Sequence, residues 1–259
     1  MIDDLLRPFS ARSLIASALL GSHPPRLPGR HLVAMAERFD ISGGTARVAL
    51  SQMVDRGELV NDGGTYELAG PLLERQERQD RGRVAPDRPW DGRWELGLVV
   101  TSGRSAADRS ALRRHLLSLG LGERREGAWM RPANLDPDRQ PKARDATVGQ
   151  IDWLVAEPVP GPAARALVGA LFDLEAWSTI ATALSEALTE AERRLDEDTD
   201  AVVTGFTLAA AALRHLSQDP LLPAELQPDG WPADDLRSSY ARYESSYQRL
   251  LRAFFQGST

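Results

Sequence analysis

The chain has 259 residues, of which 42% are hydrophobic and 26% are charged, and this composition is ordinary for a soluble globular protein. Its length is sufficient for two or three domains, each with its own core. It contains no cysteine, which excludes disulfides, thiolate catalysis and cysteine-based metal sites, and its formal net charge of −6 makes it acidic overall.

The first ten residues, MIDDLLRPFS, carry two acids and lack the apolar run of a secretory signal. The apolar stretch at 207–213 is among the longest in the chain, and it is far too short to cross a bilayer. We therefore expect a cytoplasmic protein that does not enter the membrane.

Residues 10–73 have the pattern of three helices followed by a β-hairpin. Apolar residues recur at helical spacing in SARSLIASALLGSH and RHLVAMAERFD, and the prolines of PPRLPG predict a loop between these helices. Ser42 is suited to cap a third helix at 45–56, because its hydroxyl can accept from a backbone N–H two or three residues on. The strands ELV and TYEL then flank NDGG, whose glycines allow the positive φ of a hairpin turn. This order predicts a winged helix-turn-helix domain.

The local charge of this first segment differs from the charge of the whole chain. Residues 12–56 hold six arginines against three acids, whereas residues 168–259 hold seven arginines against fifteen acids. A nucleic acid responds to the local charge, so the positive balance near the N-terminus favours DNA binding there.

The rest of the chain divides into a linker and two further segments. Residues 74–89 are strongly polar and end in glycine and proline, which predicts a linker whose first part could be helical. Residues 90–160 follow the order β-α-β-β-(α)-β of a small ferredoxin-like domain, and residues 161–259 have helical periodicity throughout. The expected fold class is therefore α+β, mostly α, with an N-terminal winged helix-turn-helix, a ferredoxin-like middle domain and a helical C-terminal domain.

The third predicted helix has one apolar side and one polar side. Ala46, Leu50, Met53 and Val54 fall on one side, where they would pack on the first two helices. The opposite side carries an arginine, small hydroxyls, an amide and a valine, which can recognise guanine, adenine and the thymine methyl in a major groove. Glycines at the start of the helix would let its free N–H groups approach a phosphate. The residues expected to contact DNA are Ser42, Gly43, Gly44, Thr45, Arg47, Val48, Ser51 and Gln52 on the helix, and Asp62, Gly63, Gly64 and Thr65 in the wing.

Two other interpretations of residues 41–60 compete with DNA binding. A nucleotide phosphate loop would follow a strand and carry a lysine-threonine or spaced-glycine pattern, and neither is present here. An ordinary amphipathic helix also has a polar outer face, so this helix alone leaves that alternative open. The preceding helix, the following hairpin and the positive local charge favour DNA.

Motifs spread along the chain carry a resemblance to a known family. SLIASALLG, TARVALSQMVDRGELV and GGTYELAG, then WDGRWELGLV and LRRHLLSLGLGERREGAWMRP, then DPLLPAELQPDGWPADDLRSSYARY, resemble the PaaX family of bacterial transcriptional repressors. The resemblance extends from Ser13 to Phe254 in the family's order. It implies a homodimer that binds an inverted repeat near a promoter and is released by a small acyl-CoA, phenylacetyl-CoA in the founding case.

The resemblance also implies which residues read the DNA and where this chain differs. The readout role passes to Thr45, Arg47, Val48, Ser51 and Gln52. Family members usually carry arginine at the position of Gln52, so this chain has one cation fewer on its reading face. We therefore expect its operator sequence to differ from those of its relatives.

The identity of the effector is not implied by the resemblance, and we expect an acyl-CoA or an aromatic acid, with no cofactor. Such a ligand needs arginines for its phosphates and aromatic side chains around its acyl group. Solvated arginines and ordinary core aromatics remain the alternative explanation of every candidate. The candidates are Arg113, Arg114, Arg124, Arg125 and Arg131 near Trp129 in the middle segment, and Trp177, Trp231, Tyr240, Tyr243 and Tyr247 in the last.

We expect no enzymatic activity. The middle segment resembles the small metal-dependent nucleases of bacterial CRISPR adaptation, whose chemistry needs a carboxylate near the end of the first strand. Here that strand ends LVVTSGR, and Glu95 near its start is its only acid. The four histidines are widely spaced, so no metal site is predicted. The other alternative is a structural protein that binds a partner through its acidic helical segment.

Overall fold

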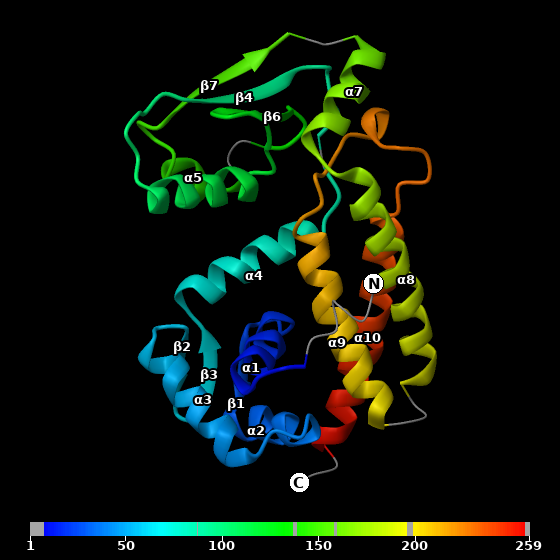
Figure 1. Ribbon diagram of the computed structural model, residues 1–259. Coiled ribbons are helices and arrows are strands. Elements are labelled where there is room, and N and C mark those ends of the chain that lie inside the picture. Colours follow the sequence, from blue (N-terminus) through cyan, green and yellow to red (C-terminus); the bar gives the residue numbers. More distant parts are fainter. Residues whose placement is uncertain (1–7, 87, 137–138, 158–159, 196–198, 257–259) are drawn as a thin grey trace. The chain divides into compact units, whose positions relative to one another are not determined.

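The computed structural model describes residues 8–86, 88–136, 139–157, 160–195 and 199–256. The described part of the chain is an α+β fold that is mostly helical and has two small antiparallel sheets (Figure 1). It divides into two compact units. Unit 1 comprises Met1–Arg83, Ile180–Ser217 and Ala233–Thr259, and unit 2 comprises Val84–Thr179 and Gln218–Pro232.

Three helices near the N-terminus pack around one core in unit 1, as the periodicity of the sequence predicts. Leu14 and Ile15 on the first helix and Leu50 and Met53 on the third are each 2% exposed or less. Burying side chains of this size removes enough apolar surface from water to hold three short helices together. The helices are α1 (Ala11–Leu20), α2 (Gly29–Arg38) and α3 (Gly43–Asp55).

A three-stranded sheet accompanies these helices, with strand order β1-β3-β2. The hairpin strands are β2 (Leu59–Asp62) and β3 (Thr65–Leu68), as predicted. The third strand, β1 (Arg26–Pro28), lies within the stretch predicted as a loop from its prolines, so that prediction was wrong. Pro28 is compatible with a strand here because β1 is at the edge of the sheet, where a missing N–H costs little.

The segment predicted as a linker begins as a packed helix, α4 (Gly70–Gly82). Gln76 is 4% exposed, and its amide donates to the carbonyls of Leu20 at 3.1 Å and Ser22 at 3.0 Å, at the end of α1. A Cβ added to Gly82 would lie 2.5 Å from the carbonyl oxygen of Leu216. The helical start agrees with the prediction, but the packing of the helix was not predicted, because glutamines rather than a stripe of apolar residues occupy much of its buried side.

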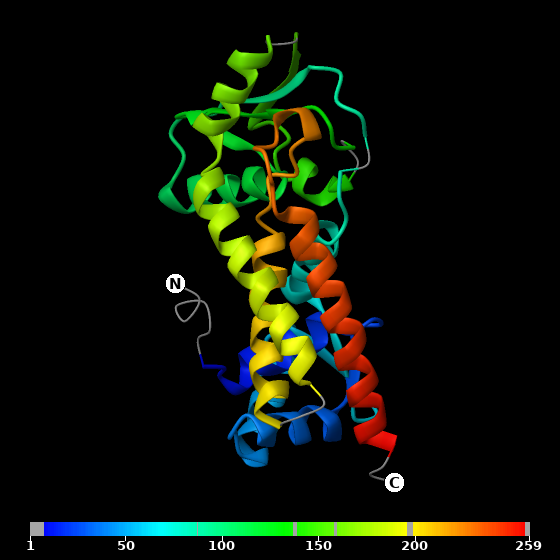
Figure 2. The same ribbon diagram turned by 90° about the vertical axis from the view of Figure 1, so that its right-hand side faces the viewer.

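Three long helices from the C-terminal part of the chain contribute to unit 1, namely α8 (Leu174–Arg194), α9 (Thr199–Leu216) and α10 (Ala233–Gln256). Figure 2 shows the three running side by side over much of their length. The hydroxyls of Ser185 on α8 and Ser239 on α10 lie 2.8 Å apart. The first turn of α8 groups with unit 2.

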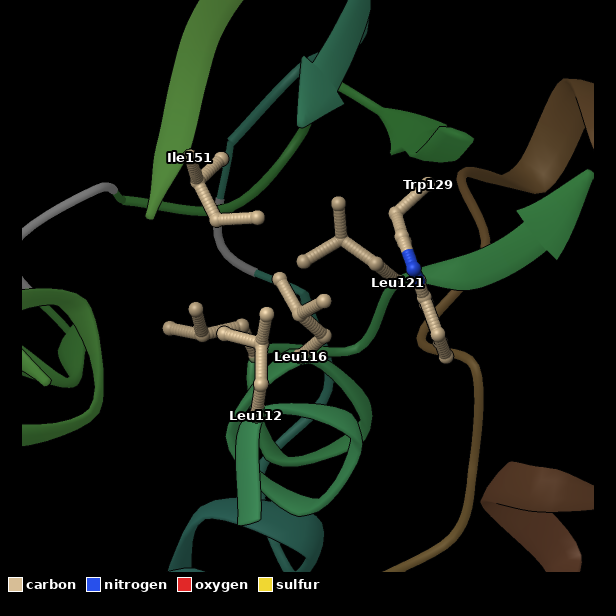
Figure 3. Packing of buried hydrophobic residues seen from close by; sticks show 6 residues of the cluster. Leu112, Leu116, Leu121, Trp129 and Ile151 are labelled. Carbon is tan, nitrogen blue, oxygen red and sulfur yellow. The ribbon is translucent and has the colours of Figure 1, made fainter. Parts of the chain in front are cut away.

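Unit 2 is built on a four-stranded antiparallel sheet of order β5-β6-β4-β7. Its element order, strand-helix-strand-strand-helix-strand, is the order predicted from the sequence. Leu112 and Leu116 of the first helix point toward Leu121, Trp129 and Ile151 and form a core with them (Figure 3). The elements are β4 (Trp94–Val99), α5 (Ala106–Ser118), β5 (Gly122–Arg125), β6 (Ala128–Pro132), α6 (Pro141–Asp145) and β7 (Ile151–Ala156).

Two segments that the sequence assigns to the helical C-terminal domain pack with the middle unit. They are α7 (Gly161–Leu171) and the 218–232 segment, which contains a short 3-10 helix at Ala224–Leu226. Their Val168 and Leu222 are 1% exposed or less and share a core with Trp94 of β4. The division at residue 160 therefore differs from the grouping in the structure, because that core joins segments that are distant in the sequence.

Among the described residues, no single helix is both long enough and apolar enough to cross a membrane. The bent pair Ala163–Leu171 and Leu174–Arg194 passes the same test of length and composition only when its two helices are taken together.

Candidate nucleic-acid interface

The start of α3 is capped as the sequence predicts. The Ser42 hydroxyl accepts a hydrogen bond from the backbone N–H of Thr45 at 3.1 Å, and it lies 2.8 Å from the Thr45 hydroxyl. Capping satisfies one of the N–H groups that a helix leaves without an intrahelical partner. The remaining free N–H groups of this turn point out of the helix start, where an anion is favoured.

The outer face of α3 is polar and open to solvent. Val48 is 58% exposed, and Arg47, Ser51 and Gln52 are also exposed. Among the described residues, Arg47 has no ion-pair partner within 4.0 Å. The helix therefore presents a free guanidinium, a hydroxyl, an amide and a valine methyl side by side, while Ala46, Ala49, Leu50 and Met53 are buried on its opposite side.

The two glycines at the start of α3 have different surroundings. A Cβ added to Gly43 would lie 2.6 Å from Glu37 Oε1 and 3.2 Å from Arg47 Nη1, so two side chains of this chain already occupy that space. Gly44 is exposed, and the nearest atom to its added Cβ would be Ser42 Oγ at 3.8 Å. Of the two, Gly44 is the glycine that leaves the helix start open to a phosphate.

The predicted wing turn is a tight two-residue turn between β2 and β3. Gly63 and Gly64 have φ values of 56° and 85°, and positive φ at both central residues is typical of the type I′ hairpin turn. The backbone N–H of Gly64 donates to Asn61 Oδ1 at 3.0 Å, and its carbonyl accepts from the N–H of Gly29 at 2.8 Å. The second bond joins the turn to the first residue of α2. Asp62, Gly63 and Gly64 are exposed and Thr65 is half-buried.

Not every arginine of this segment is free to contact DNA. Arg12 forms two hydrogen bonds with the Glu58 carboxylate, at 2.9 and 2.6 Å, and this contact ties α1 to the residue just before β2. Its guanidinium holds the pKa of Glu58 below the usual range, so the pair is ionised at pH 7. Arg12 is itself exposed, and the other exposed arginines of this segment are Arg26, Arg30, Arg38, Arg47 and Arg56.

The residues predicted to bind a ligand in the middle segment are not brought together around a cavity of ligand size. Arg131 is 4% exposed and donates to the carbonyls of Leu119 at 3.0 Å and Pro132 at 3.1 Å, and it lies 3.6 Å from Glu95. Burial lowers its pKa to about 10, so it remains a cation at pH 7. The cavity beside it has a volume of about 10 Å³, which is close to the minimum for one water molecule.

The other residues of that set also have different surroundings. Trp129 is 4% exposed and belongs to the core of unit 2. Arg113 pairs with Glu123, and its guanidinium carbon lies 5.1 Å from the centre of the Trp129 ring. Arg114, Arg124 and Arg125 are exposed. These contacts account for Arg131, Trp129 and Arg113 without a ligand.

The carboxylate weighed for nuclease chemistry is engaged by arginines. Glu95 of β4 is bonded to Arg144 and lies near Arg131. A carboxylate held by two guanidinium groups is a poor ligand for a divalent metal, because the cations already neutralise it. Within the described ranges, no cluster of three or more His, Asp or Glu side chains is placed to hold a metal ion.

The aromatic candidates fall into two separate groups. Trp177 and Trp231 stack in unit 2, with their ring centres 4.5 Å apart. Tyr240, Tyr243 and Tyr247 lie on one face of α10 in unit 1, where they line a cavity of about 530 Å³. The other walls of this cavity come from α1, β1, α2 and α9, so the spacing of the tyrosines was the only local signal of it in the sequence.

Three family models match the chain along most of its length. They are described as PaaX-like protein over residues 10–71, PaaX protein central Cas2-like domain over residues 87–168, and PaaX-like protein C-terminal domain over residues 172–257. A solved structure, that of the uncharacterised protein Rv0674 from Mycobacterium tuberculosis, is 37% identical to this chain with a TM-score of 0.71. That similarity covers 93% of this chain and 96% of that one. The comparison with curated proteins found no match.

Proposed function

The chain belongs to the PaaX-like family of transcriptional regulators, and on this premise we propose that it is a repressor that binds duplex DNA through α3 and the wing turn. The observation that carries the proposal is the open outer face of α3. Its Arg47 has no ion-pair partner among the described residues, although most of the arginines discussed in unit 2 are paired. A guanidinium left unpaired on a helix can form a bidentate contact with guanine.

We interpret the N-terminal part of unit 1 as a winged helix-turn-helix. In this arrangement α3 enters the major groove and the turn at Gly63-Gly64 contacts the backbone beside it. The hydrogen bond from Gly29 to Gly64 supports the interpretation, because it fixes the turn to α2, the helix that precedes α3. The backbone contacts would position the protein and the side chains of α3 would supply the sequence preference.

We interpret unit 2 as a ferredoxin-like domain that serves as a scaffold rather than as an enzyme. The strand order β5-β6-β4-β7 supports this assignment, and so do α5, which connects β4 to β5, and α6, which connects β6 to β7. The pairing of Glu95 with Arg144 supports the absence of nuclease chemistry.

The proposed active species is a homodimer on an inverted repeat. A two-fold symmetric dimer presents two copies of α3 to two half-sites, so its operator would be palindromic. The resemblance to the family also supports release by a small effector such as an aryl or acyl-CoA. A cytoplasmic location follows from this role.

The test is DNA binding by the full chain, measured by fluorescence anisotropy on a labelled duplex from upstream of its own gene. Arg47→Ala should weaken binding by about 1–3 kcal/mol, because it removes a bidentate base contact. The matched control is Arg193→Ala on α8, where the side chain is 70% exposed and pairs with Glu190. The control should bind as the parent does, because exposed pairs contribute little.

Two results would contradict the assignment of α3. The first is equal affinity of the Arg47→Ala variant and the parent. The second is an affinity that does not change with salt, because phosphate contacts release counterions and must weaken as salt rises. Binding of another protein by the acidic helices, with no DNA affinity at any salt, would favour the alternative of a partner-binding protein.

A further inference from the structure

Helices α9 and α10 form one side of the cavity in unit 1. Large side chains line it from α10, and small ones are among those that line it from α9. Tyr240, Tyr243 and Tyr247 follow each other at helical spacing on α10. On α9 the corresponding face carries Ala209 and Ala210, which are too small to fill the space opposite the rings. The cavity between them has a volume of about 530 Å³. A volume of this size is within the usual range of small-molecule sites.

The opposite wall of the cavity belongs to the elements that hold the proposed DNA-binding surface. Leu27 lies on β1, and His31 and Met35 lie on α2. Strand β1 pairs with β3, with Pro28 opposite Thr65, at the base of the wing turn. Helix α2 directly precedes α3 and packs against it. The same elements therefore line the cavity and position the reading face.

Two residues that line the cavity, Phe206 and Tyr247, belong to an aromatic cluster that reaches the end of α2. Phe206 of α9 lies 5.9 Å from Tyr247 and 5.6 Å from Phe39, measured between ring centres. Phe39 ends α2, four residues before α3 begins at Gly43. A shift of Tyr247 or Phe206 would therefore change the packing of Phe39, at the connection between α2 and α3.

The chemistry of the lining is that of a site for a neutral aromatic ring. Burial raises the pKa of Tyr240, Tyr243 and Tyr247 well above the usual range, so all three are neutral phenols at pH 7. Burial also lowers the pKa of His31, which makes its neutral form predominate. The lining is mainly apolar, and aromatic rings pack favourably against such walls in offset or edge-on geometry.

One charged group on the cavity wall is available to a ligand, and it is a cation. The carboxylate of Glu244 is already engaged by Arg83 and by the hydroxyl of Tyr240 at 3.0 Å. Arg26 on β1 is exposed and has no ion pair within 4.0 Å among the residues that the structure describes. An apolar aromatic chamber with a free guanidinium on its wall fits a molecule that combines a ring with an anionic group.

We propose that the cavity between α10, α9, α2 and β1 is the effector site of this protein, and that it binds an aromatic anion whose ring lies against the α10 tyrosines and whose charge meets Arg26. Binding there lowers the affinity for DNA, because an occupied cavity displaces β1 and α2, which position the wing turn and α3. A ligand shifts this equilibrium only by its difference in affinity for the two arrangements. The regulatory part rests on the proposed function, whereas the binding part does not.

Binding is tested with two fluorescent probes that differ by one charged group, 8-anilinonaphthalene-1-sulfonate and the uncharged N-phenyl-1-naphthylamine. The full chain should bind one molecule of either probe. Ala210→Phe fills the chamber and should abolish binding of both probes. The matched control is Ala241→Phe, which adds the same group at an exposed position of α10 and should leave binding unchanged. Equal probe affinity of the Ala210→Phe variant and the parent would overturn the site.

Arg26→Gln tests the charge, and it keeps the proposal falsifiable if Ala210→Phe does not fold, because position 26 is exposed. The variant should bind the sulfonate probe about tenfold more weakly, since a hydrogen bond to a charged group is lost. Its affinity for the uncharged probe should not change. A variant that binds the sulfonate probe as tightly as the parent would overturn the role of Arg26.

The regulatory part is tested by repeating the DNA titration with the sulfonate probe at saturation. The affinity of the parent chain should fall at least about tenfold, which is a typical strength of coupling between two sites. The affinity of the Ala210→Phe variant should not respond to the probe. An unchanged affinity of the probe-saturated parent would overturn the coupling. If the chain binds no DNA at all, the proposed function and the regulatory part fail together, while the probe titrations still decide whether the site exists.

Discussion

Arg47 of α3 and Arg131 of β6 are both candidate binding residues, and the structure gives them opposite surroundings. Arg47 is exposed on the outer face of its helix and has no ion-pair partner within the described part of the chain. Arg131 is 4% exposed, donates to two backbone carbonyls and faces Glu95. Both side chains end in the same guanidinium group. The guanidinium of Arg131 donates its hydrogen bonds within the protein, whereas that of Arg47 is open to solvent.

The difference shows why residue type alone does not identify a binding site. An arginine recognises an anion only when its donors are free and its approach is open. On the outer face of α3 these conditions are met by Arg47, whereas in unit 2 Arg131 and Arg144 are engaged by Glu95. The comparison can be tested by changing each region and measuring both stability and DNA binding.

The largest effect is expected for Arg131→Ala. The change leaves the carbonyls of Leu119 and Pro132 without their donor and removes a buried cation, so the free energy of unfolding should fall by about 3–5 kcal/mol. Urea denaturation followed by circular dichroism measures this loss. Arg124→Ala, an exposed position two residues beyond the start of β5, is the control and should stay within about 0.5 kcal/mol of the parent. A loss below about 1 kcal/mol for Arg131→Ala would remove the contrast between the two arginines.

A smaller effect is expected for Ser42→Ala. This change should lower both the free energy of unfolding and the DNA affinity, because both depend on the start of α3. Loss of the bond from Thr45 N–H should lower the free energy of unfolding by about 1 kcal/mol. The start of α3 should fray as a result, so DNA affinity should fall as well, and anisotropy titrations can measure that change. Ser42→Asp would restore the cap, because aspartate accepts the same bond. A Ser42→Ala variant as stable as the parent would show that the cap contributes nothing.

The smallest effect is expected for Gln52→Arg, which adds the cation that the resemblance to the PaaX family implies at this position. The side chain is exposed, so stability should be unchanged within about 0.5 kcal/mol. If the new guanidinium meets a phosphate, the slope of log K against log salt should steepen by about 0.9. The measurement is DNA affinity at several salt concentrations. An unchanged slope together with an unchanged preference among duplexes would place residue 52 away from the DNA.

Local features of the N-terminal part could be predicted from the sequence because each depends on a few adjacent residues. Ser42 caps α3 through the next turn of the same helix, and Gly63-Gly64 form their own tight turn. The strand β1 was missed because its prolines argue for a loop, and only its partner β3 on the interior of the sheet makes it a strand. A pairing partner forty residues away leaves no local pattern.

The cavity could not be predicted for a related reason. Its tyrosines on α10 and its Leu27 on β1 are more than two hundred residues apart in the sequence. Regular spacing at Tyr240, Tyr243 and Tyr247 indicates a buried helix face, and the same spacing serves a filled core equally well. The void depends on Ala209 and Ala210 lying opposite those rings, which only the packing of two helices determines.

The bond between Gln76 and the end of α1 has a consequence for protein engineering. Residues 10–73, the segment predicted as the DNA-binding domain, leave out Gln76, whose amide donates to the carbonyls of Leu20 and Ser22. A chimera joined to a foreign partner after residue 73 would therefore lose these two hydrogen bonds at the end of α1, whereas one that retains α4 up to Arg83 would keep them. The proposed DNA-binding segment is therefore expected to keep its stability in a chimera only when α4 is included with it.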